Sequence, residues 1–143
     1  MKVKDDFNIE TGISTVTLQT KDGNFIGKAK IHPDDKPYIN KFFGLRIAEI
    51  RAYIKSLNKK ISIINNKIFA IHSLEKDFLK DENFRNLSLH MQLYILKKIN
   101  EHILCYDNII KDYKQEQDEL KTEIKNNIKE REKIKKIIKD KTE

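Results

Sequence analysis

The segment His32-Pro33-Asp34-Asp35 holds the densest cluster of chemically versatile side chains in the sequence. An imidazole beside two carboxylates could bind a divalent cation, or it could form hydrogen bonds with the hydroxyl groups of a sugar. The competing interpretation is structural, because an aspartate just before a helix caps its unpaired amides and Pro37 suits a first helical turn. Both interpretations hold if one aspartate caps the helix and the other faces a ligand.

Arginine is scarce in this chain, with four among 29 basic residues, so its positions are informative. A planar guanidinium binds phosphate through two parallel hydrogen bonds, whereas a lysine ammonium acts as a point charge. Arg46 has a helical partner in Glu49, three residues along the same face, while Arg51 has no evident partner. Both arginines, together with Lys28, are candidates for binding phosphate.

Aromatic side chains near these cations could stack on a nucleobase. Phe43 lies next to a glycine that would let a ligand approach closely, although the ring could instead cover the open face of a sheet. Tyr113 lies on an apolar helical seam, where tyrosine most often controls the register of pairing. An antiparallel pairing of the helices about residue 82 sets Tyr113 opposite Arg51, which predicts a cleft that also contains Gln117.

The sequence lacks the motifs of the familiar enzyme classes. Its four glycines form neither a dinucleotide-binding nor a phosphate-binding loop, and no serine-hydrolase, zinc-protease or paired-cysteine motif occurs. The four histidines have no metal-ligand spacing, and the single Cys105 has no evident activating neighbour. We therefore expect a protein that is not an enzyme, holds no metal and needs no cofactor.

The composition restricts the class of protein. With 143 residues, the chain is expected to form one domain over residues 1–143, and its 36% of charged residues suits long amphipathic helices. No apolar run is long enough to cross a bilayer and no signal peptide is evident, so we expect a cytoplasmic protein without a membrane partner. The net charge of +7 is divided between the middle and the end of the chain, which makes nucleic-acid binding possible but not favoured.

The elements that must position these residues begin with strands. Residues 1–12 have little pattern and are expected to form a loose arm. Residues 13–32 alternate β-branched and polar side chains about Asp22-Gly23, a typical two-residue turn, and are predicted to form a β-hairpin. Folding across that turn pairs Leu18 with Gly27 and leaves one face of the hairpin mostly apolar.

The rest of the chain is predicted to be helical. Residues 33–41 contain both prolines and form a connector, and apolar residues then recur every three and four positions over helices at 42–79 and 84–140. Antiparallel pairing leaves the second helix without a partner from about residue 123, which indicates self-association. The sequence thus predicts an α+β fold, mainly α: an N-terminal β-hairpin packed on a long antiparallel, coiled-coil-like helical hairpin, assembled as a homo-oligomer.

The run Phe25-Ile26-Gly27-Lys28-Ala29-Lys30-Ile31-His32-Pro33-Asp34-Asp35, with Gly44, Ala48-Glu49, Arg51-Ala52 and Ile54-Lys55 after it, resembles a family of small phage and prophage proteins of Gram-positive bacteria. The two-stranded start, the His-Pro-Asp-Asp turn and the two long helices are similar to the Thoeris anti-defence sponge. Members of that family bind cyclic ADP-ribose signals made by bacterial TIR proteins and sequester them without cleavage. They act as dimers or larger assemblies with pockets between subunits.

The resemblance implies a non-enzymatic phage anti-defence protein that sequesters a cyclic ADP-ribose isomer at a site between subunits, in the cytoplasm of the host cell. The cations would hold phosphate, an aromatic ring would stack on the base, and the imidazole or a carboxylate would contact ribose. The candidate ligand-binding residues are Lys28, His32, Asp34, Phe43, Arg46, Arg51 and Tyr113. The alternative is an oligomeric coiled-coil module that binds a host protein or nucleic acid.

Overall fold

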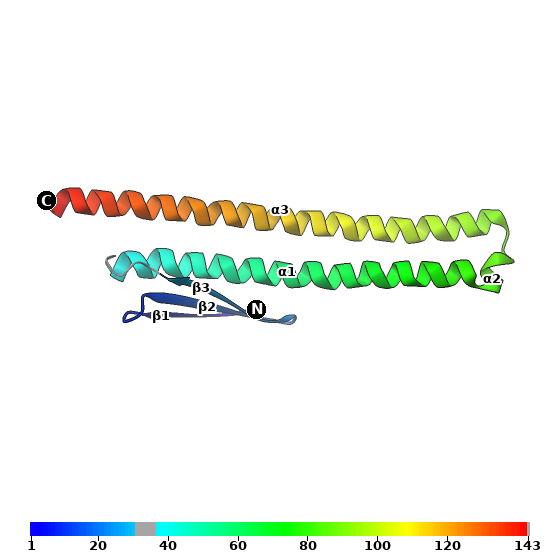
Figure 1. Cartoon of the computed structure of the whole chain (residues 1–143), viewed down its shortest axis with the longest axis horizontal. Coiled ribbons are helices and arrows are strands. Elements are labelled where there is room, and N and C mark those ends of the chain that lie inside the picture. The colour runs from blue at the N-terminus through cyan, green and yellow to red at the C-terminus, as the bar shows by residue number, and fades with distance from the viewer. Residues whose placement is uncertain (31–36, 143) are drawn as a thin grey trace. The chain divides into compact units, whose positions relative to one another are not determined.

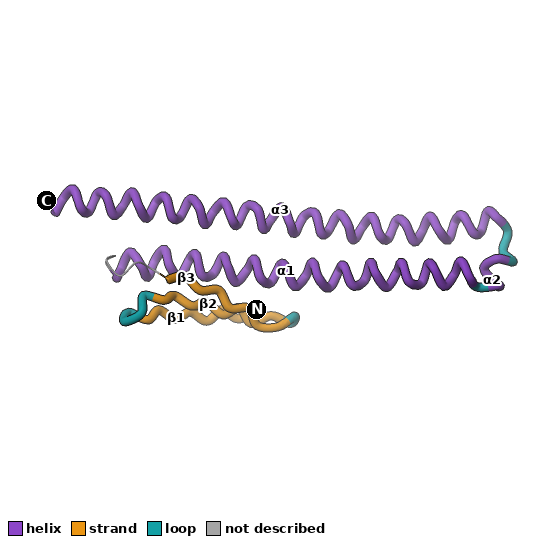
Figure 2. The backbone as a smooth tube through the Cα atoms, viewed as in Figure 1, coloured by secondary structure: helices purple, strands orange, loops and turns teal. Residues whose placement is uncertain are grey.

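The protein has an α+β fold that is mainly α, as the sequence predicts (Figure 1). The computed structural model describes residues 1–30 and 37–142. Three strands precede three helices along the chain, and Figure 2 shows how much of the backbone is helical. The elements are β1 (Lys2–Asn8), β2 (Ile13–Thr20), β3 (Gly23–Lys30), α1 (Pro37–Lys80), α2 (Glu82–Arg85) and α3 (Leu89–Thr142).

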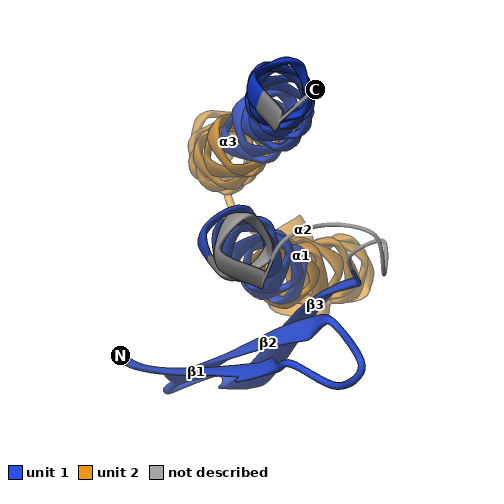
Figure 3. Cartoon of the chain, turned by 90° about the vertical axis from the view of Figure 1, so that its left-hand side faces the viewer, with its two compact units in different colours: residues 1–59, 116–143 blue, residues 60–115 orange. Residues whose placement is uncertain are grey.

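The chain divides into two compact units, coloured separately in Figure 3. Unit 1 comprises residues 1–59 and 116–143, and unit 2 comprises residues 60–115. Unit 1 therefore contains the sheet, the first part of α1 and the last part of α3. Unit 2 contains the remainder of both long helices and the short α2 that links them. No helix formed by the described residues is long and apolar enough to span a bilayer.

The sheet has three antiparallel strands in the order β1-β2-β3, so the prediction of a loose arm at residues 1–12 is wrong. The whole of β1 pairs with β2, with Val3 opposite Leu18. The turn between them is closed by Asn8, whose side-chain oxygen accepts hydrogen bonds from the amides of Glu10 and Thr11. β1 lacks a clear sequence pattern because it is exposed over most of its length. It forms a strand because the edge of β2 offers unpaired backbone groups for hydrogen bonding.

The register between β2 and β3 is displaced by two residues from the predicted one. Leu18 faces Phe25 instead of Gly27, because the turn consists of Lys21 and Asp22 and the next residue, Gly23, already pairs with Thr20. A displacement of two residues keeps each side chain on its original face, since side chains alternate along a strand. The predicted apolar face therefore survives the error in register.

That apolar face packs against α1 in unit 1. Val16 and Leu18 are almost completely buried, and they form one core cluster with Ile47, Ala48 and Ala52 of the helix, all three also buried. The small residues at the contact allow the helix backbone to approach the sheet closely.

Gly27 marks the closest approach between β3 and α1. A Cβ atom at this position would lie 1.9 Å from the carbonyl oxygen of Ala48 and 2.6 Å from the amide nitrogen of Ala52. Both distances are far below van der Waals contact, and both involve backbone atoms that cannot rotate away. Only glycine therefore fits at this position of β3.

The two long helices run antiparallel within unit 1, but about one heptad away from the predicted pairing. Gln117 of α3 is buried and donates its side-chain amide to the carbonyl of Ile54 at 3.1 Å and to Oδ1 of Asn58 at 2.6 Å. The prediction placed Gln117 opposite Ile47. A shift of one heptad keeps apolar seams in contact, so apolar spacing alone does not decide between the two registers.

The prediction that the second helix has no partner from about residue 123 is therefore wrong for the first residues of that stretch. Glu123 binds Arg46 of α1, and Ile124 packs against the core cluster. The helices also differ from the predicted bounds of 42–79 and 84–140, because α1 already begins at Pro37 and α3 begins only at Leu89.

The link between the long helices in unit 2 explains the displaced register. Asp81 caps α2 by accepting a hydrogen bond from the amide of Asn83 at 2.8 Å, and Phe84 is buried. The side-chain amide of Gln92 donates to the carbonyl oxygens of Phe84, Arg85 and Leu87. The link is thus a structured segment of several residues, longer than the brief interruption predicted near residue 82.

We predict that Gly27→Ala destabilises unit 1 strongly. The added methyl group forces the α1 backbone away from β3, and overpacking of this kind costs about 3 kcal/mol. The measurement is the thermal unfolding midpoint from the circular dichroism of the full chain. The control is Ser14→Ala on the same buried face, where the hydroxyl has no hydrogen-bond partner among the described residues. Removal of that buried hydroxyl is expected to leave the midpoint unchanged or raise it. A Gly27→Ala midpoint equal to that of the parent chain would contradict the close approach.

Candidate functional site

An open groove of about 610 Å³ lies between the edge strand β3 and helix α1 in unit 1. β3 contributes three consecutive residues and α1 contributes one turn of helix. The lining residues are Ile26, Gly27, Lys28, Arg51, Ile54 and Lys55. Half of them are cations and none carries a carboxylate, so the groove is electropositive.

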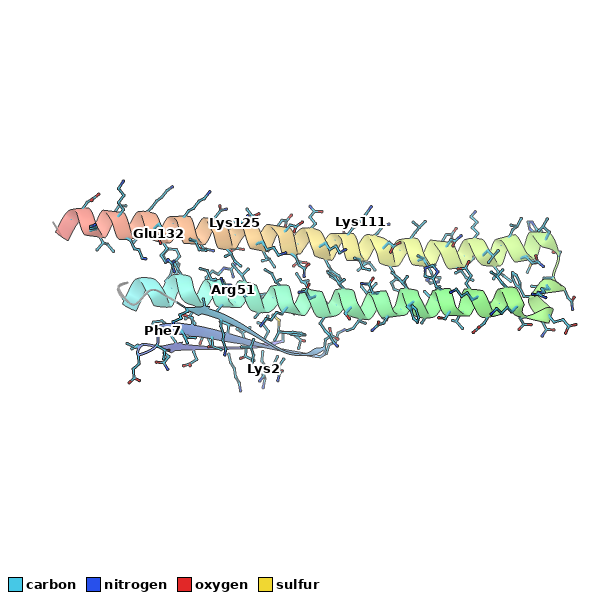
Figure 4. The ribbon with its side chains drawn as sticks, in the orientation of Figure 1. Lys2, Phe7, Arg51, Lys111, Lys125 and Glu132 are labelled. Carbon is cyan, nitrogen blue, oxygen red and sulfur yellow. The ribbon has the colours of Figure 1, made fainter. Side chains whose placement is uncertain are left out.

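Two of the cations are held by the edge of the sheet. Nη1 of Arg51 donates to the carbonyl oxygen of Lys28 at 2.7 Å, and Nζ of Lys55 donates to that of Ile26 at 2.6 Å. Figure 4 labels Arg51 on α1. Four residues of helix advance about 6 Å and two residues of strand advance about 6.8 Å. The helical spacing therefore matches the spacing of alternate carbonyl groups along β3.

The three cations retain donors for a further partner. A guanidinium has five N–H donors and an ammonium has three. Arg51 and Lys55 each use one nitrogen for the hydrogen bond to a β3 carbonyl oxygen. Across residues 1–30 and 37–142, no ion pair joins Lys28, Arg51 or Lys55 to a carboxylate. An anion in the groove would therefore meet positive charge that no ion pair among the described residues compensates.

The same contacts have a structural role at the edge of the sheet. β3 is an edge strand, and unpaired backbone groups on such a strand invite pairing with another chain. Arg51 and Lys55 occupy two of its carbonyl oxygens and surround them with charge. They therefore protect the edge of β3 and line the groove at the same time.

Arg46 lies outside this groove although it belongs to the same helix as Arg51. Its Nε donates to Oε1 of Glu123 at 2.9 Å, and its Nη1 lies 3.4 Å from Oε2 of Glu49. The hydrogen bond with Glu123 is the largest cause that raises the pKa of Arg46 above its ordinary value. The guanidinium fork is occupied by carboxylates, so Arg46 does not offer the phosphate site considered for it from the sequence.

Neither aromatic candidate is among the residues that line the groove. Phe43 is 3% exposed and packs edge-to-face against Phe42 at a centroid distance of 5.1 Å, so it cannot stack on a ligand. Tyr113 belongs to unit 2, where Nζ of Lys60 lies 5.6 Å from its ring centroid.

Arg51 and Gln117, which were predicted to line one cleft with Tyr113, are not brought together within unit 1. Arg51 is bound to β3, whereas Gln117 is bound to the side of α1 that faces α3. The prediction is wrong because it rested on the helix register that is displaced by about one heptad. The predicted contacts of His32 and Asp34 fall outside the described residues.

No protein-family model, curated protein or solved structure matches this chain. The groove between β3 and α1 is therefore a candidate site on its geometry alone.

Sequence reasoning found Lys28 and Arg51 but missed Lys55. The signal was present, because a residue four positions after Arg51 lies on the same face of a helix, one turn further along. No cluster of three or more metal-ligating side chains occurs among the described residues. A second opening in unit 1, of about 480 Å³, includes Asp5, Arg46 and Glu49, and its carboxylates make it a poorer anion site.

We predict that the ion pair between Arg46 and Glu123 contributes less than about 1 kcal/mol to stability, because both side chains are exposed enough for water to screen the charges. The measurement is a double-mutant cycle of Arg46→Ala and Glu123→Ala, followed by urea unfolding at low and high salt. The coupling should shrink as the ionic strength rises. A coupling of several kcal/mol that persists in 1 M salt would show that the pair is a buried interaction instead.

Proposed function

We propose that this protein binds and sequesters a phosphate-bearing small ligand in the groove between β3 and α1, without converting it chemically. The proposal rests on Arg51 and Lys55, which are held one helical turn apart at the edge of β3 beside Lys28, in a groove where none of the six lining residues carries a carboxylate. The ligand class is the cyclic nucleotides, and specifically a cyclic ADP-ribose isomer. In this proposal the protein is a phage anti-defence sponge that acts as a homo-oligomer in the cytoplasm of the host cell.

The size and lining of the groove support a nucleotide ligand. A volume of about 610 Å³ falls within the range of small-molecule sites. Arg51 can bind phosphate oxygens through its planar fork, while the two lysines add charge. Ile26, which is 43% exposed, and Ile54 offer apolar surface to the sugar or base. A cyclic ADP-ribose isomer combines these features, because ribose sugars link its pyrophosphate to an adenine base that has an apolar face.

The lining also supports capture rather than catalysis. None of the six lining residues carries a carboxylate, imidazole, hydroxyl or thiol. These are the groups that serve most often as nucleophiles or general bases. A ligand held here would meet cations that stabilise its charge, and the lining offers it no activated nucleophile.

We predict that a matching ligand raises the thermal midpoint of the full chain and that Arg51→Ala abolishes most of this effect. A ligand at 100 times its dissociation constant adds about 2.7 kcal/mol to stability, which corresponds to a shift of several degrees. The ligands to titrate are individual cyclic ADP-ribose isomers, with inorganic pyrophosphate as a simpler probe. Arg51→Ala and Lys55→Ala should each raise the dissociation constant at least about tenfold, since each removes a charge-assisted hydrogen bond.

The matched control is Arg46→Ala. It removes the same charge from the same helix, five residues away, but from an arginine that carboxylates already occupy. Its affinity for the ligand should stay within about twofold of that of the parent chain, because distant surface charges are screened. Equal losses in Arg46→Ala and Arg51→Ala would mean that binding depends only on net charge. No thermal shift with any of the ligands would reject the groove as a nucleotide site.

The alternative function, an oligomeric coiled-coil module for a host protein or nucleic acid, is favoured by a separate observation. Several large apolar side chains on unit 2 are strongly exposed, among them Phe69 at 74%, Leu89 at 70% and Leu104 at 60%. Exposed apolar surface of this kind marks sites of protein contact. DNA binding that falls steeply with salt and ignores sequence would instead support the nucleic-acid form of this alternative.

A further inference from the structure

We infer that unit 2 carries an interface for a second copy of this chain, formed by one flank of its helix pair. The flank is centred on a second groove, of about 330 Å³, to which α1 and α3 both contribute. The residues that line this unit 2 groove are Ile71, Leu74, Phe78, Tyr94, Ile95, Lys98, Ile99 and His102. Apart from one lysine and one histidine they are apolar or aromatic, so the groove suits a protein surface rather than a phosphate.

The groove is the uncovered side of the helical seam. Ile71 and Phe78 of α1 occupy the heptad position that also contains Ile64, which is buried at 9% exposure. At the groove, the residue in this heptad position is much less buried, because Phe78 is 43% exposed. Two paired helices cover only part of an apolar stripe that is 100° wide or more. The rest of the stripe stays open to water until another helical surface packs on it.

The exposed apolar area of the flank approaches what a standard protein interface requires. Leu74, Phe78 and Tyr94 line the groove with 57%, 43% and 53% of their surface exposed, and Met91, one turn before Tyr94, is 45% exposed. With about 200 Å² for each large side chain, these four residues present about 400 Å² of apolar surface. A stable interface buries about 800 Å² per partner, of which somewhat more than half is apolar.

The apolar character of the flank suits a second copy of the chain. Two copies related by a two-fold axis place the same exposed apolar side chains, Leu74 and Tyr94 among them, against each other, so that each flank covers the other. Four helices then enclose the two seams as a bundle, which is a common way to bury such stripes.

The charges on the flank do not oppose this pairing. Nζ of Lys98 lies 3.3 Å from Oε2 of Glu101 in its own chain and 5.5 Å from the centroid of the Tyr94 ring. The lysine charge at the rim is therefore compensated within each copy. Two such flanks can approach each other without placing uncompensated lysine ammonium groups in opposition.

The test is the molar mass of the full chain in solution, measured by sedimentation over a range of concentrations. The parent chain should be a dimer, and Leu74→Glu should raise the dimer dissociation constant at least about 100-fold, because it places a carboxylate in an apolar interface twice. The control is Leu104→Glu. Leu104 is 60% exposed, close to the 57% of Leu74, but it lies two residues beyond His102 and so faces away from the groove. This variant should remain a dimer.

A second variant keeps the test decisive if Leu74→Glu fails to fold, which circular dichroism would reveal. Tyr94→Glu alters the opposite wall of the groove, on α3, and should also yield a folded monomer. A parent chain that is monomeric at about 100 µM would overturn the inference and leave the flank to a different protein. Dissociation by Leu104→Glu as readily as by Leu74→Glu would overturn it too, as would folded Leu74→Glu and Tyr94→Glu chains that remain dimers.

Discussion

The contact of the α1 backbone with Gly27 is the constraint on which the candidate site depends. Ala48 and Ala52 are completely buried, and neither they nor Gly27 hold the helix away from the strand. The helix therefore lies low on β3, within reach of the side chains that follow these alanines. Arg51 and Lys55 meet the β3 carbonyls for this reason. A methyl group between the helix and β3 would lengthen both contacts. The same close packing that forms the core therefore also sets the position of the two cations.

The distribution of carboxylates, more than the number of cations, distinguishes the groove from the rest of this basic protein. Arg46 and Arg51 belong to the same helix, yet Arg46 is held by Glu49 and Glu123, while the partner that Arg51 has among the described residues is a neutral carbonyl. An anion that displaced Glu123 from Arg46 would have to replace a charge-assisted hydrogen bond. At Arg51 the anion would add to the existing contact.

The sequence predicted the faces of the elements better than their registers. Periodicity identifies which side of a strand or helix is apolar, so the apolar side chains of β2 and the helical seams were predicted correctly. It does not distinguish pairings displaced by two residues in a hairpin or by seven in a helix pair, and both errors occurred. Specific contacts decide these registers, such as those of Gln117 with Ile54 and Asn58. The burial of Phe43 with Phe42 left exposed depends likewise on the rotation of α1, which the sequence does not reveal.

The most direct test of the central claim, that Lys28, Arg51 and Lys55 form an anion site, is chemical-shift mapping of the full chain by ¹H–¹⁵N nuclear magnetic resonance. Inorganic pyrophosphate and the cyclic ADP-ribose isomers are the titrants. If these cations bind the anion, the largest changes fall on the amides of residues 26–28 and 51–55, and they saturate. Changes spread evenly over the many lysines of α3, or centred on Arg46, would contradict it.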